Sequence, residues 1–574
     1  MAVAIAFAGL TAVRAVGAGI DAPVAANEAG RASSEQWRGF IWDAIPAEAL
    51  KKAEPDILTT AYQQAGWKPL FITSRFQTDE AASVLLSRLN RLEQEAIDPG
   101  PYKLDEIQSA VQKLDAARSA LCNADPACGD SRAEPSARTE TAPPQSVQRP
   151  GEGVSGPNTA QAPDAARQAE IQKLYDDAFR AAADLDIKLV LATVRYAAEM
   201  NPSAKEEREK AFSGEIPLAG FIEGLTPSSQ NYETLARAYA VYGKLSKETR
   251  QPYNGPLKIK HGESGNHIRD LQKRLAQEGL YDGKLSGVFD SETQNALKNF
   301  QSAHNVEPDG VIGQRTKDWL NTSFQEKAGL IAQSLRAMRQ SPTRGQTRYV
   351  RINIPQFMLE YYRDEKVQES HRVVIGKASG KKVKFRGAMV GENQTPTLSS
   401  EIEQVIVNPR WYVNDRIHLE LNAEAGSDPD YWSKHGYVRM DSSYPGGQKR
   451  LFQRPGPKNA LGVVKFEFPN PYAVYMHDTP TKHLFARARR DFSHGCIRLD
   501  KAVSFAQTLL ADDHSRYAQK GDSLFTGERQ LFIKLSQPVP IVIEYIPAAA
   551  NANGQVIFFG DVYGLYKNDS GPKA

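Results

Sequence analysis

The first half of the chain repeats apolar residues at intervals of three and four positions. This spacing runs from residue 34 to about 118, and it returns at 166–200 and at 231–245, with charged residues in between. Such a period predicts amphipathic helices that bury one face. We therefore expect a helical scaffold in two parts, residues 34–120 and 167–255.

A period of two residues takes over after position 345. Tyr349–Ile354 and Val464–Phe468 alternate apolar and polar side chains, as half-buried strands do. Five shorter stretches are further candidate strands: Phe357–Tyr362, Arg372–Ile375, Glu403–Val407, Tyr472–Met476 and Ile541–Tyr545. Short strands separated by glycine and proline turns predict a mostly-β sandwich or partial barrel over 345–548, followed by a C-terminal extension at 549–574. The expected fold class is α+β multidomain.

Between these blocks, residues 258–322 form a small unit with two matching turns. Asp282-Gly283 and Asp309-Gly310 each begin a turn that leads into a threonine-containing helix. The helix that follows the first turn opens with Asp290-Ser-Glu-Thr-Gln294, a favourable N-cap sequence. The unit is therefore expected to hold three short helices, and a connecting helix is expected at 324–340.

Two segments break these patterns. Between 121 and 166, Pro, Gly, Ser, Ala and Thr dominate, so the segment cannot bury enough apolar surface to offset its ordering entropy. We expect a flexible insert or linker there, with an ordered surface loop as the alternative. From 415 to 453 the pattern is irregular, polar and rich in tyrosine. This segment fits either a lid over a cleft or an ordinary surface excursion.

Length and charge narrow the class of protein. At 574 residues the chain is too long for one hydrophobic core, which predicts about three or four domains. The content of 41% hydrophobic and 24% charged residues is typical of a globular protein. A net charge of +3 without a concentrated basic run argues against a nucleic-acid-binding protein.

Residues 1–30 resemble a secretion signal. The first twenty residues are small and apolar apart from Arg14, and Pro23–Ala29 is similar to the small-residue region before a signal-peptidase cut. The usual basic start is missing, so a short buried or disordered N-terminus is the alternative. No other stretch reaches the ~18 apolar residues that a membrane helix needs, and no stable membrane span is expected elsewhere.

Three cysteines divide into a pair and a single residue. Cys122 and Cys128 lie six positions apart, close enough for a local disulfide in an oxidising compartment. Three free thiols in a reducing compartment are the alternative. Pairing the first two leaves Cys496 free, as a nucleophile must be.

Cys496 lies in the block Ser493-His494-Gly495-Cys496-Ile497-Arg498, downstream of Tyr475-Met-His477-Asp-Thr-Pro480. A thiol needs a lowered pKa or a base within hydrogen-bond reach to attack an amide at neutral pH. His477 ends a predicted strand and His494 lies two residues before the cysteine, so both are candidate bases. The residues alone predict a cysteine acyl-transfer site and leave the choice of base open.

Three other interpretations use the same residues. The histidines could be structural polar residues, or Cys496 could be an inert buried cysteine. Alternatively, His477, Asp478, His494 and Cys496 could bind zinc, although no CxxC or HExxH spacing supports a metal site. We expect no metal.

The two blocks resemble the signature of the L,D-transpeptidases of the YkuD type. The resemblance extends through Arg454–Gly462, Lys465–Tyr472 and Phe559–Gly564, which are similar to the long Gram-negative form with a scaffold domain. Phe300-Gln301, followed by Asp309-Gly310-Val-Ile-Gly313, is similar to the small three-helix peptidoglycan-binding domain. In this chain that domain would either bind wall material or act as a spacer.

The resemblance implies that Cys496 attacks the meso-diaminopimelate–D-Ala bond of a tetrapeptide stem and that His477 is the base. The thioester would pass to an amine of a second stem, which gives a 3→3 cross-link. Backbone N–H groups of Gly495 and Cys496, with the Tyr475 hydroxyl, would hold the oxyanion. The remaining roles would be positioning for His494 and Ser493, loop fixation or substrate-carboxylate binding for Arg498, and lining of the cleft for Trp411.

The same resemblance implies peptidoglycan as donor and acceptor, no cofactor, a periplasmic location, a role in cell-wall biogenesis and cell shape, and acylation by carbapenems. An L,D-carboxypeptidase, or an enzyme that anchors proteins to the wall, would use identical residues. A non-catalytic peptidoglycan-binding scaffold is the alternative from another class, and the intact set of motif residues argues against it. Departures from the family pattern at Tyr412, Asn414 and Leu499-Asp500-Lys501 flank the cleft and leave the acceptor open.

Overall fold

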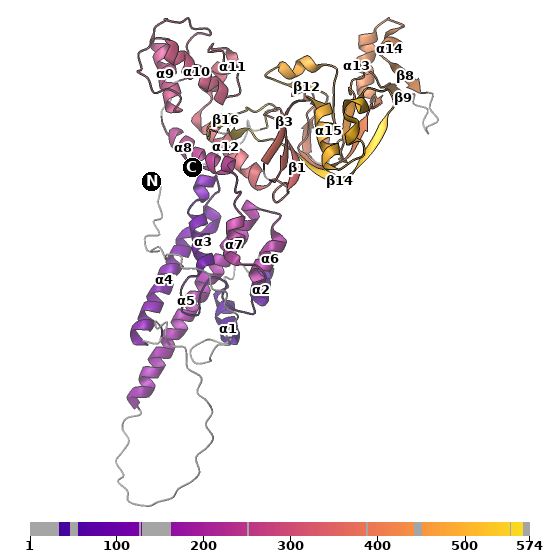
Figure 1. The fold of residues 1–574 in the computed structure, drawn as a ribbon. Helices are drawn as coiled ribbons and strands as arrows, with labels where there is room; N and C mark the ends of the chain where they lie inside the picture. The colour runs from indigo at the N-terminus through magenta and orange to yellow at the C-terminus, as the bar shows by residue number, and fades with distance from the viewer. Residues whose placement is uncertain are drawn as a thin grey trace, which may run out of the picture. The chain divides into compact units, whose positions relative to one another are not determined.

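The computed structural model of the chain describes residues 34–45, 55–125, 128, 162–248, 252–364, 366–385, 388–440, 450–551 and 553–565. The signal-like N-terminus and most of the 121–166 segment lie outside these ranges. The chain divides into two compact units, Met1–Pro227 and Ser228–Ala574, each of which is described by itself. Figure 1 shows the elements of both units.

The first unit is helical, as the apolar period predicts. Its helices are α1 Ser34–Ala44, α2 Pro55–Gln64, α3 Glu80–Leu89, α4 Leu104–Ala124, α5 Ala162–Met200, α6 Lys205–Ser213 and α7 Leu218–Gly224, with 3-10 turns at Leu92–Glu95 and Gly100–Tyr102. None of the described helices of the chain is both long enough and apolar enough to cross a membrane.

A buried carboxylate organises the first unit. Asp186 of α5 is fully buried and accepts hydrogen bonds from the Tyr62 hydroxyl at 2.7 Å and from the backbone N–H of Phe71 at 2.7 Å. Burial raises the pKa of Asp186 to about 6 although these hydrogen bonds act in the opposite direction. Tyr62 therefore serves as a packing anchor, and its ring stacks on that of Trp67.

Cys122 and Cys128 of the first unit are joined by a disulfide with a Cα–Cα distance of 4.9 Å.

The second unit begins with helix α8 Gln230–Leu245 and the three-helix domain. Helices α9 Asn266–Gln277, α10 Ser291–Ala303 and α11 Gln314–Asn321 enclose a core that includes Leu271, Leu297 and Phe300. Asp290 caps α10 as expected, since its side chain accepts a hydrogen bond from the Thr293 N–H. Helix α12 Phe324–Arg339 follows, with a capping box formed by Ser323 and Glu326.

Two buried glutamines explain why the turns of this domain match. Gln272 accepts a hydrogen bond from the Gly287 N–H at 2.9 Å, and Gln301 accepts one from the Gly310 N–H at 2.8 Å. Each glutamine also donates to a backbone carbonyl of its turn, at Val288 and Val311 respectively. The same side chain thus replaces backbone pairing in both turns.

The rest of the second unit is a sheet of nine strands in the order β12-β3-β13-β11-β10-β6-β14-β1-β2. Strand β2 also pairs with β3, so the sheet closes on itself as a barrel rather than remaining an open sandwich. The strands of this sheet are β1 Arg348–Asn353, β2 Met358–Arg363, β3 Lys366–Gly376, β6 Leu398–Val407, β10 Val464–Glu467, β11 Met476–His477, β12 Asp491–Ser493, β13 Ile497–Leu499 and β14 Leu531–Glu544. Helix α15 Ala502–Asp512 lies against the sheet (Figure 1). Its Phe505 ring contacts that of Phe466 of β10.

The polar stretch at 415–453 is more regular than the sequence predicts. It holds helices α13 Asp415–Ala425 and α14 Tyr431–Lys434, and strand β9 Arg450–Gln453 pairs with β7 Trp411–Tyr412 on one side and with β8 Tyr437–Met440 on the other. Asn414 caps α13 by accepting a hydrogen bond from the Ile417 N–H at 2.9 Å. Rings of Trp432 and Tyr437 pack together at 5.5 Å between centroids. A polar helix with an aromatic cluster lacks a clear apolar period, which is why the sequence pattern does not reveal these elements. Residues 441–449 lie outside the described part.

Two hairpins complete the unit. Strands β4 Lys382–Phe385 and β5 Ala388–Gly391 pair with each other, as do β15 Ala548–Ala550 and β16 Val556–Phe558. The second hairpin packs on α8 and α12, where the Ala550 N–H donates to the Asn231 side chain at 2.6 Å and the Ala548 N–H donates to Ser334 Oγ at 2.9 Å. The segment expected as a C-terminal extension is therefore part of the second unit.

Candidate active site

Strands β11 and β13 bring the two sequence blocks together. The strands run parallel, with Met476 opposite Ile497, and both of these side chains are fully buried in the core. Because side chains alternate along a strand, the flanking residues project from the opposite face of the sheet. The residues on that face are Tyr475, His477, Cys496 and Arg498. The two blocks thus form a single surface.

A tight turn presents Cys496 at the start of β13. Gly495 has a φ of +114°, a conformation that favours glycine. Buried Ser493 accepts a hydrogen bond from the Gly495 N–H at 3.2 Å and donates one to the Cys496 carbonyl at 2.5 Å. Thr395 Oγ1 fixes the turn from the other side by donating to the Gly495 carbonyl at 2.8 Å. Cys496 is free and half-buried.

This turn changes one expected role. The resemblance predicts that the Gly495 N–H contributes to an oxyanion hole, but here that N–H is directed to Ser493 Oγ. The difference arises because a serine two residues before the glycine offers an acceptor within the same turn. Gly495 therefore acts through its backbone conformation, and the Tyr475 hydroxyl and the Cys496 N–H stay as the candidate oxyanion donors.

His477 is held as a neutral imidazole with a defined tautomer. Its side chain is buried, and Nδ1 lies within hydrogen-bond distance of the Asp478 carbonyl oxygen. A carbonyl only accepts, so Nδ1 carries the hydrogen and Nε2 carries the lone pair. Burial, with the charges of Arg498 and Lys465, lowers the pKa of His477 to about 3. His477 is thus neutral at physiological pH, with its lone pair at Nε2.

Tyr475 connects the thiol to the wall of the site. Burial raises the pKa of the Cys496 thiol, whereas hydrogen bonds from the backbone and side chain of Tyr475 and the charges of Lys465 and Arg498 act in the opposite direction. The Tyr475 hydroxyl in turn interacts with the side chain of Trp411. Trp411 lies on β7 and reaches the site through this contact.

Lys465 is a site residue that sequence reasoning missed. It pairs with His477 across the antiparallel strands β10 and β11, and its Nζ lies 4.3 Å from the centroid of the Tyr475 ring. Glu467 holds this ammonium at 2.9 Å and itself accepts a hydrogen bond from Gln404. The sequence places Lys465 in a predicted strand, where it alternates with buried residues. This pattern indicates on which face of the strand Lys465 lies, but not which residues of other strands lie next to it.

Arg498 and Asp478 stabilise the surroundings of the site. Arg498 lies opposite His477 in the register and donates to Thr481 Oγ1 at 3.1 Å, which fixes the loop after His477. Asp478 is buried, accepts a hydrogen bond from the Val463 N–H at 3.1 Å and pairs with Lys482. Gly462 packs directly against this carboxylate, since a Cβ there would lie 2.2 Å from Asp478 Oδ2.

The His494 ring contacts a carboxylate of another element, which argues against His494 as the base. Its Nε2 lies 2.8 Å from Glu420 Oε2 of helix α13. This contact ties the turn before Cys496 to the 411–453 segment, which agrees with a positioning role. The four residues weighed as zinc ligands consequently turn to different partners. Among the residues that the structure describes, no three His, Cys, Asp or Glu side chains form a group that could hold a metal ion.

A tyrosine near the C-terminal end of the described chain supports the cysteine turn. The Tyr563 hydroxyl accepts a hydrogen bond from the Thr395 N–H at 3.1 Å and donates one to the Gly376 carbonyl at 2.9 Å. The Tyr545 hydroxyl accepts from the Tyr563 N–H at 2.8 Å. Thr395 then reaches Gly495, so a chain of three contacts links this segment to Cys496. No pattern in the sequence predicts these long-range contacts.

Comparison with known proteins assigns two domains. Residues 347–535 match the L,D-transpeptidase catalytic domain (YkuD), and residues 264–320 match the "putative peptidoglycan binding domain". Both matches fall within the domain ranges expected from the sequence, and they confirm the resemblance. The chain therefore combines an L,D-transpeptidase catalytic domain with a peptidoglycan-binding domain.

Two named relatives each match only part of this chain and only part of their own length. A protein of Haemophilus influenzae named "Putative L,D-transpeptidase" is 29% identical over 231 residues, 37% of this chain and 43% of that protein. The spore cortex-lytic enzyme of Oceanobacillus iheyensis is 47% identical over 62 residues, 11% of this chain and 22% of that protein. The chain thus spans less than half the length of either relative. The crystal structure of an L,D-transpeptidase (residues 123–326) from Xylanimonas cellulosilytica aligns over 51% of this chain and 100% of its own, with 17% identity and a TM-score of 0.17.

Proposed function

We propose that this protein is a peptidoglycan L,D-transpeptidase with Cys496 as its nucleophile. The observation that supports this most is the surface shared by Cys496, Tyr475 and His477, with His477 neutral and its lone pair on Nε2. A buried thiol with a raised pKa is mostly protonated at neutral pH, so it requires a base rather than a preformed ion pair. His477 meets that need.

In the first half of the reaction, Cys496 Sγ bonds to the carbonyl carbon between meso-diaminopimelate and D-Ala of a tetrapeptide stem. His477 Nε2 takes the thiol proton and then transfers it to the leaving nitrogen, so D-Ala departs as a neutral amine and a thioester remains. The Tyr475 hydroxyl and the Cys496 N–H donate to the carbonyl oxygen as it gains charge.

In the second half, the side-chain amine of another stem attacks the thioester carbonyl. His477 accepts a proton from that amine and returns it to the departing sulfur, which restores the thiol and leaves a 3→3 amide cross-link. Water in place of the amine would give a free tripeptide, the product of an L,D-carboxypeptidase. Both outcomes use the same residues and differ in the product.

The deciding experiment is mass spectrometry of a disaccharide-tetrapeptide incubated with the full chain and with Cys496→Ala. We expect D-Ala release and a cross-linked dimer from the unaltered chain only. Tripeptide without dimer would instead identify a carboxypeptidase. Equal product from both proteins would contradict the assignment of Cys496. A carbapenem is expected to add its mass to the unaltered chain and not to Cys496→Ala.

We also propose a periplasmic location for the protein. The disulfide between Cys122 and Cys128 supports this, because such bonds persist in oxidising compartments. Thiol counting on protein isolated without reductant should give one reactive thiol, Cys496, and three after reduction. Three free thiols before reduction would contradict an oxidising location.

A further inference from the structure

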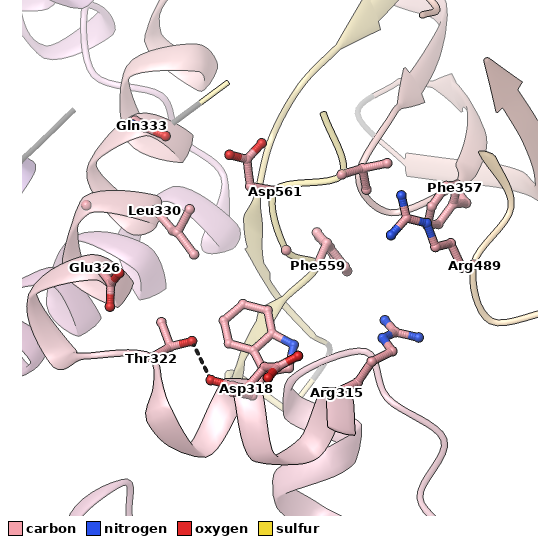
Figure 2. Close-up of a pocket in the computed structure, with 14 residues that line it drawn as sticks. Arg315, Asp318, Thr322, Glu326, Leu330, Gln333, Phe357, Arg489, Phe559 and Asp561 are labelled. Atoms are coloured by element: carbon pink, nitrogen blue, oxygen red, sulfur yellow. Dashed lines mark hydrogen bonds between the residues drawn. The ribbon is translucent and has the colours of Figure 1, made fainter. Parts of the chain in front are cut away.

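A pocket of about 500 Å³ lies where the three-helix domain meets the barrel. Its walls come from α11, from α12, from the residues around Phe357 and Arg489, and from the segment 559–562 (Figure 2). The volume falls within the usual range for sites that hold small ligands. The pocket shares no residue with the candidate active site, so the proposed reaction does not account for it.

Charge is unevenly distributed in this pocket. Figure 2 shows Arg315 and Arg489 near each other at one end, with Phe559 between them and Leu330. Burial and the adjacent Arg489 charge both lower the pKa of Arg315, as expected for two cations held close together. Arg489 forms a two-pronged pair with Asp491, and Arg315 donates to the Asn305 carbonyl. An anion bound between the guanidinium groups would relieve their repulsion.

The opposite end of the pocket offers an acceptor. Gln333 Oε1 is buried, and no described residue gives it a hydrogen bond. A buried acceptor without a partner costs stability, so such an atom in a pocket wall indicates a missing donor. Asp318, Glu326 and Asp561 also line the pocket and would attract an ammonium group. A ligand end that carries both a carboxylate and an N–H or ammonium group therefore satisfies both ends of the pocket.

We propose that this pocket binds the carboxylate-bearing end of a peptidoglycan stem peptide, with Arg315 and Arg489 on the carboxylate and Gln333 on an N–H of the peptide. This inference rests on the proposed function, which supplies stem peptides as the molecules that both domains meet. Trp319 and Phe559 provide the apolar walls against which the short side chains of a stem would pack. The pocket would hold one stem while the candidate active site handles another.

Hydrogen exchange measured by mass spectrometry tests this proposal. The full chain with Cys496→Ala, which should not turn over, is mixed with the soluble tetrapeptide L-Ala–γ-D-Glu–meso-diaminopimelate–D-Ala. We expect slowed exchange at 314–333 and 553–562, separately from any protection at 475–480, the segment that carries Tyr475 and His477. Adding Arg315→Gln with Arg489→Gln should weaken protection at the first two segments about tenfold in peptide concentration and leave 475–480 unchanged.

Matched controls make the result specific. Arg336→Gln with Arg487→Gln removes the same charge from exposed positions outside the pocket and should have no effect. Gln333→Met keeps the side-chain volume and removes the acceptor, so it should weaken binding without lowering stability. A peptide with a C-terminal amide should bind the unaltered pocket as weakly as the free acid binds the double arginine variant.

Several results would overturn the proposal. These are protection confined to 475–480, equal binding of acid and amide peptides at 314–333, or equal protection at 314–333 by the disaccharide without peptide. Failure of the proposed function is distinct, because it would appear as absent D-Ala release from the unaltered chain while peptide protection at 314–333 persists.

Discussion

Two histidines in the second unit are buried in the same way, and only one of them belongs to the candidate active site. His304 donates from Nδ1 to the Phe300 carbonyl at 2.7 Å, just as His477 donates to the Asp478 carbonyl. Burial lowers the pKa of each to about 3. Both are therefore neutral at physiological pH, with the lone pair on Nε2.

The difference lies in what meets that lone pair. Lys327 donates to Nε2 of His304 at 2.8 Å, and the same ammonium pairs with Glu278 at 2.7 Å. Burial alone would raise the pKa of Glu278, but Lys327, His304 and Arg274 outweigh it and lower the value to about 2. In this joint between the three-helix domain and α12, each charged group has a partner of opposite charge, because Lys327 and Arg274 both pair with Glu278. At His477, no described residue hydrogen-bonds Nε2.

The comparison shows that burial and one contact with a carbonyl keep an imidazole neutral and fix its tautomer. These two features alone do not make the imidazole a base. A lysine over the second nitrogen turns the same histidine into part of a structural joint. At the candidate site the corresponding lysine, Lys465, lies over the Tyr475 ring instead, where its charge reaches the thiol as well as the imidazole.

The strongest test of the comparison replaces each histidine by glutamine. His477→Gln should lower kcat for D-Ala release by about 10²- to 10⁴-fold, the usual contribution of a general base, with little change in unfolding free energy. His304→Gln should leave kcat within a few fold and lower the unfolding free energy by about 1–3 kcal/mol, because a buried partner of Lys327 is lost. Steady-state kinetics and urea unfolding measure the two effects. Similar kinetic losses in both variants would remove the distinction.

The lysines provide the next test. Lys327→Met leaves Glu278 buried without its closest cation and should cost about 3–5 kcal/mol in urea unfolding. Lys465 is only partly buried and its partner Glu467 is half-exposed, so Lys465→Met should cost less than about 1 kcal/mol. A large loss of stability in the second variant would show that Lys465 serves structure rather than the site.

Lowering the pH should destabilise the second unit through both histidines. Between the unfolded pKa of about 6.5 and the folded value of about 3, the unfolded chain binds protons that the folded chain does not. The unfolding free energy therefore falls as pH drops through this window and is insensitive to these histidines above it. Asp186 in the first unit has the opposite sign, since its folded pKa is raised to about 6.

Histidine variants isolate the relevant part of this dependence. From pH 6.5 to 5, the unfolding free energy measured in urea should fall by up to about 1.4 kcal/mol per pH unit for each buried histidine. His304→Gln should remove the contribution of one histidine to this slope. A slope unchanged in this variant would mean that His304 is protonated in the folded protein. The kcat/KM profile should likewise lack a decline near pH 6.5.

The smallest expected effect concerns the reactivity of the thiol. Lys465→Met removes a charge that lowers the pKa of Cys496, so alkylation by iodoacetamide at pH 8 should slow about three- to tenfold. Lys465→Arg keeps the charge and should stay close to the unaltered rate. The pH dependence of alkylation should move to higher pH in the methionine variant only; a uniform slowing at every pH would indicate a steric effect.

Much of this arrangement follows from local patterns. The helical periods, the Asp290 cap and the alternating strands carry their information within a few residues, and the two motif blocks around His477 and Cys496 lie on adjacent strands. What could not be predicted depends on contacts across the fold. The order of strands brings Lys465 beside Tyr475, α13 brings Glu420 to His494, and the segment after β16 brings Tyr563 to Thr395.

The two candidate bases likewise differ in where their side chains point, which their distance from Cys496 along the sequence does not predict. His494 is close to Cys496 along the chain, but its ring reaches Glu420. His477 is distant along the chain, but the parallel pairing of β11 and β13 places it on the same face as the thiol. A serine within the cysteine turn removed the Gly495 N–H from its expected role for an equally local reason.

The support that Tyr563 gives to the cysteine turn has a consequence for when the site forms. During synthesis, Cys496 leaves the ribosome well before Tyr563, so the turn is complete only after the segment beyond β16 has folded back against Thr395. The turn around Cys496 is thereby incomplete on the nascent chain. Proteolytic trimming of that segment would reverse the process and return the enzyme to its unassembled state without touching the barrel.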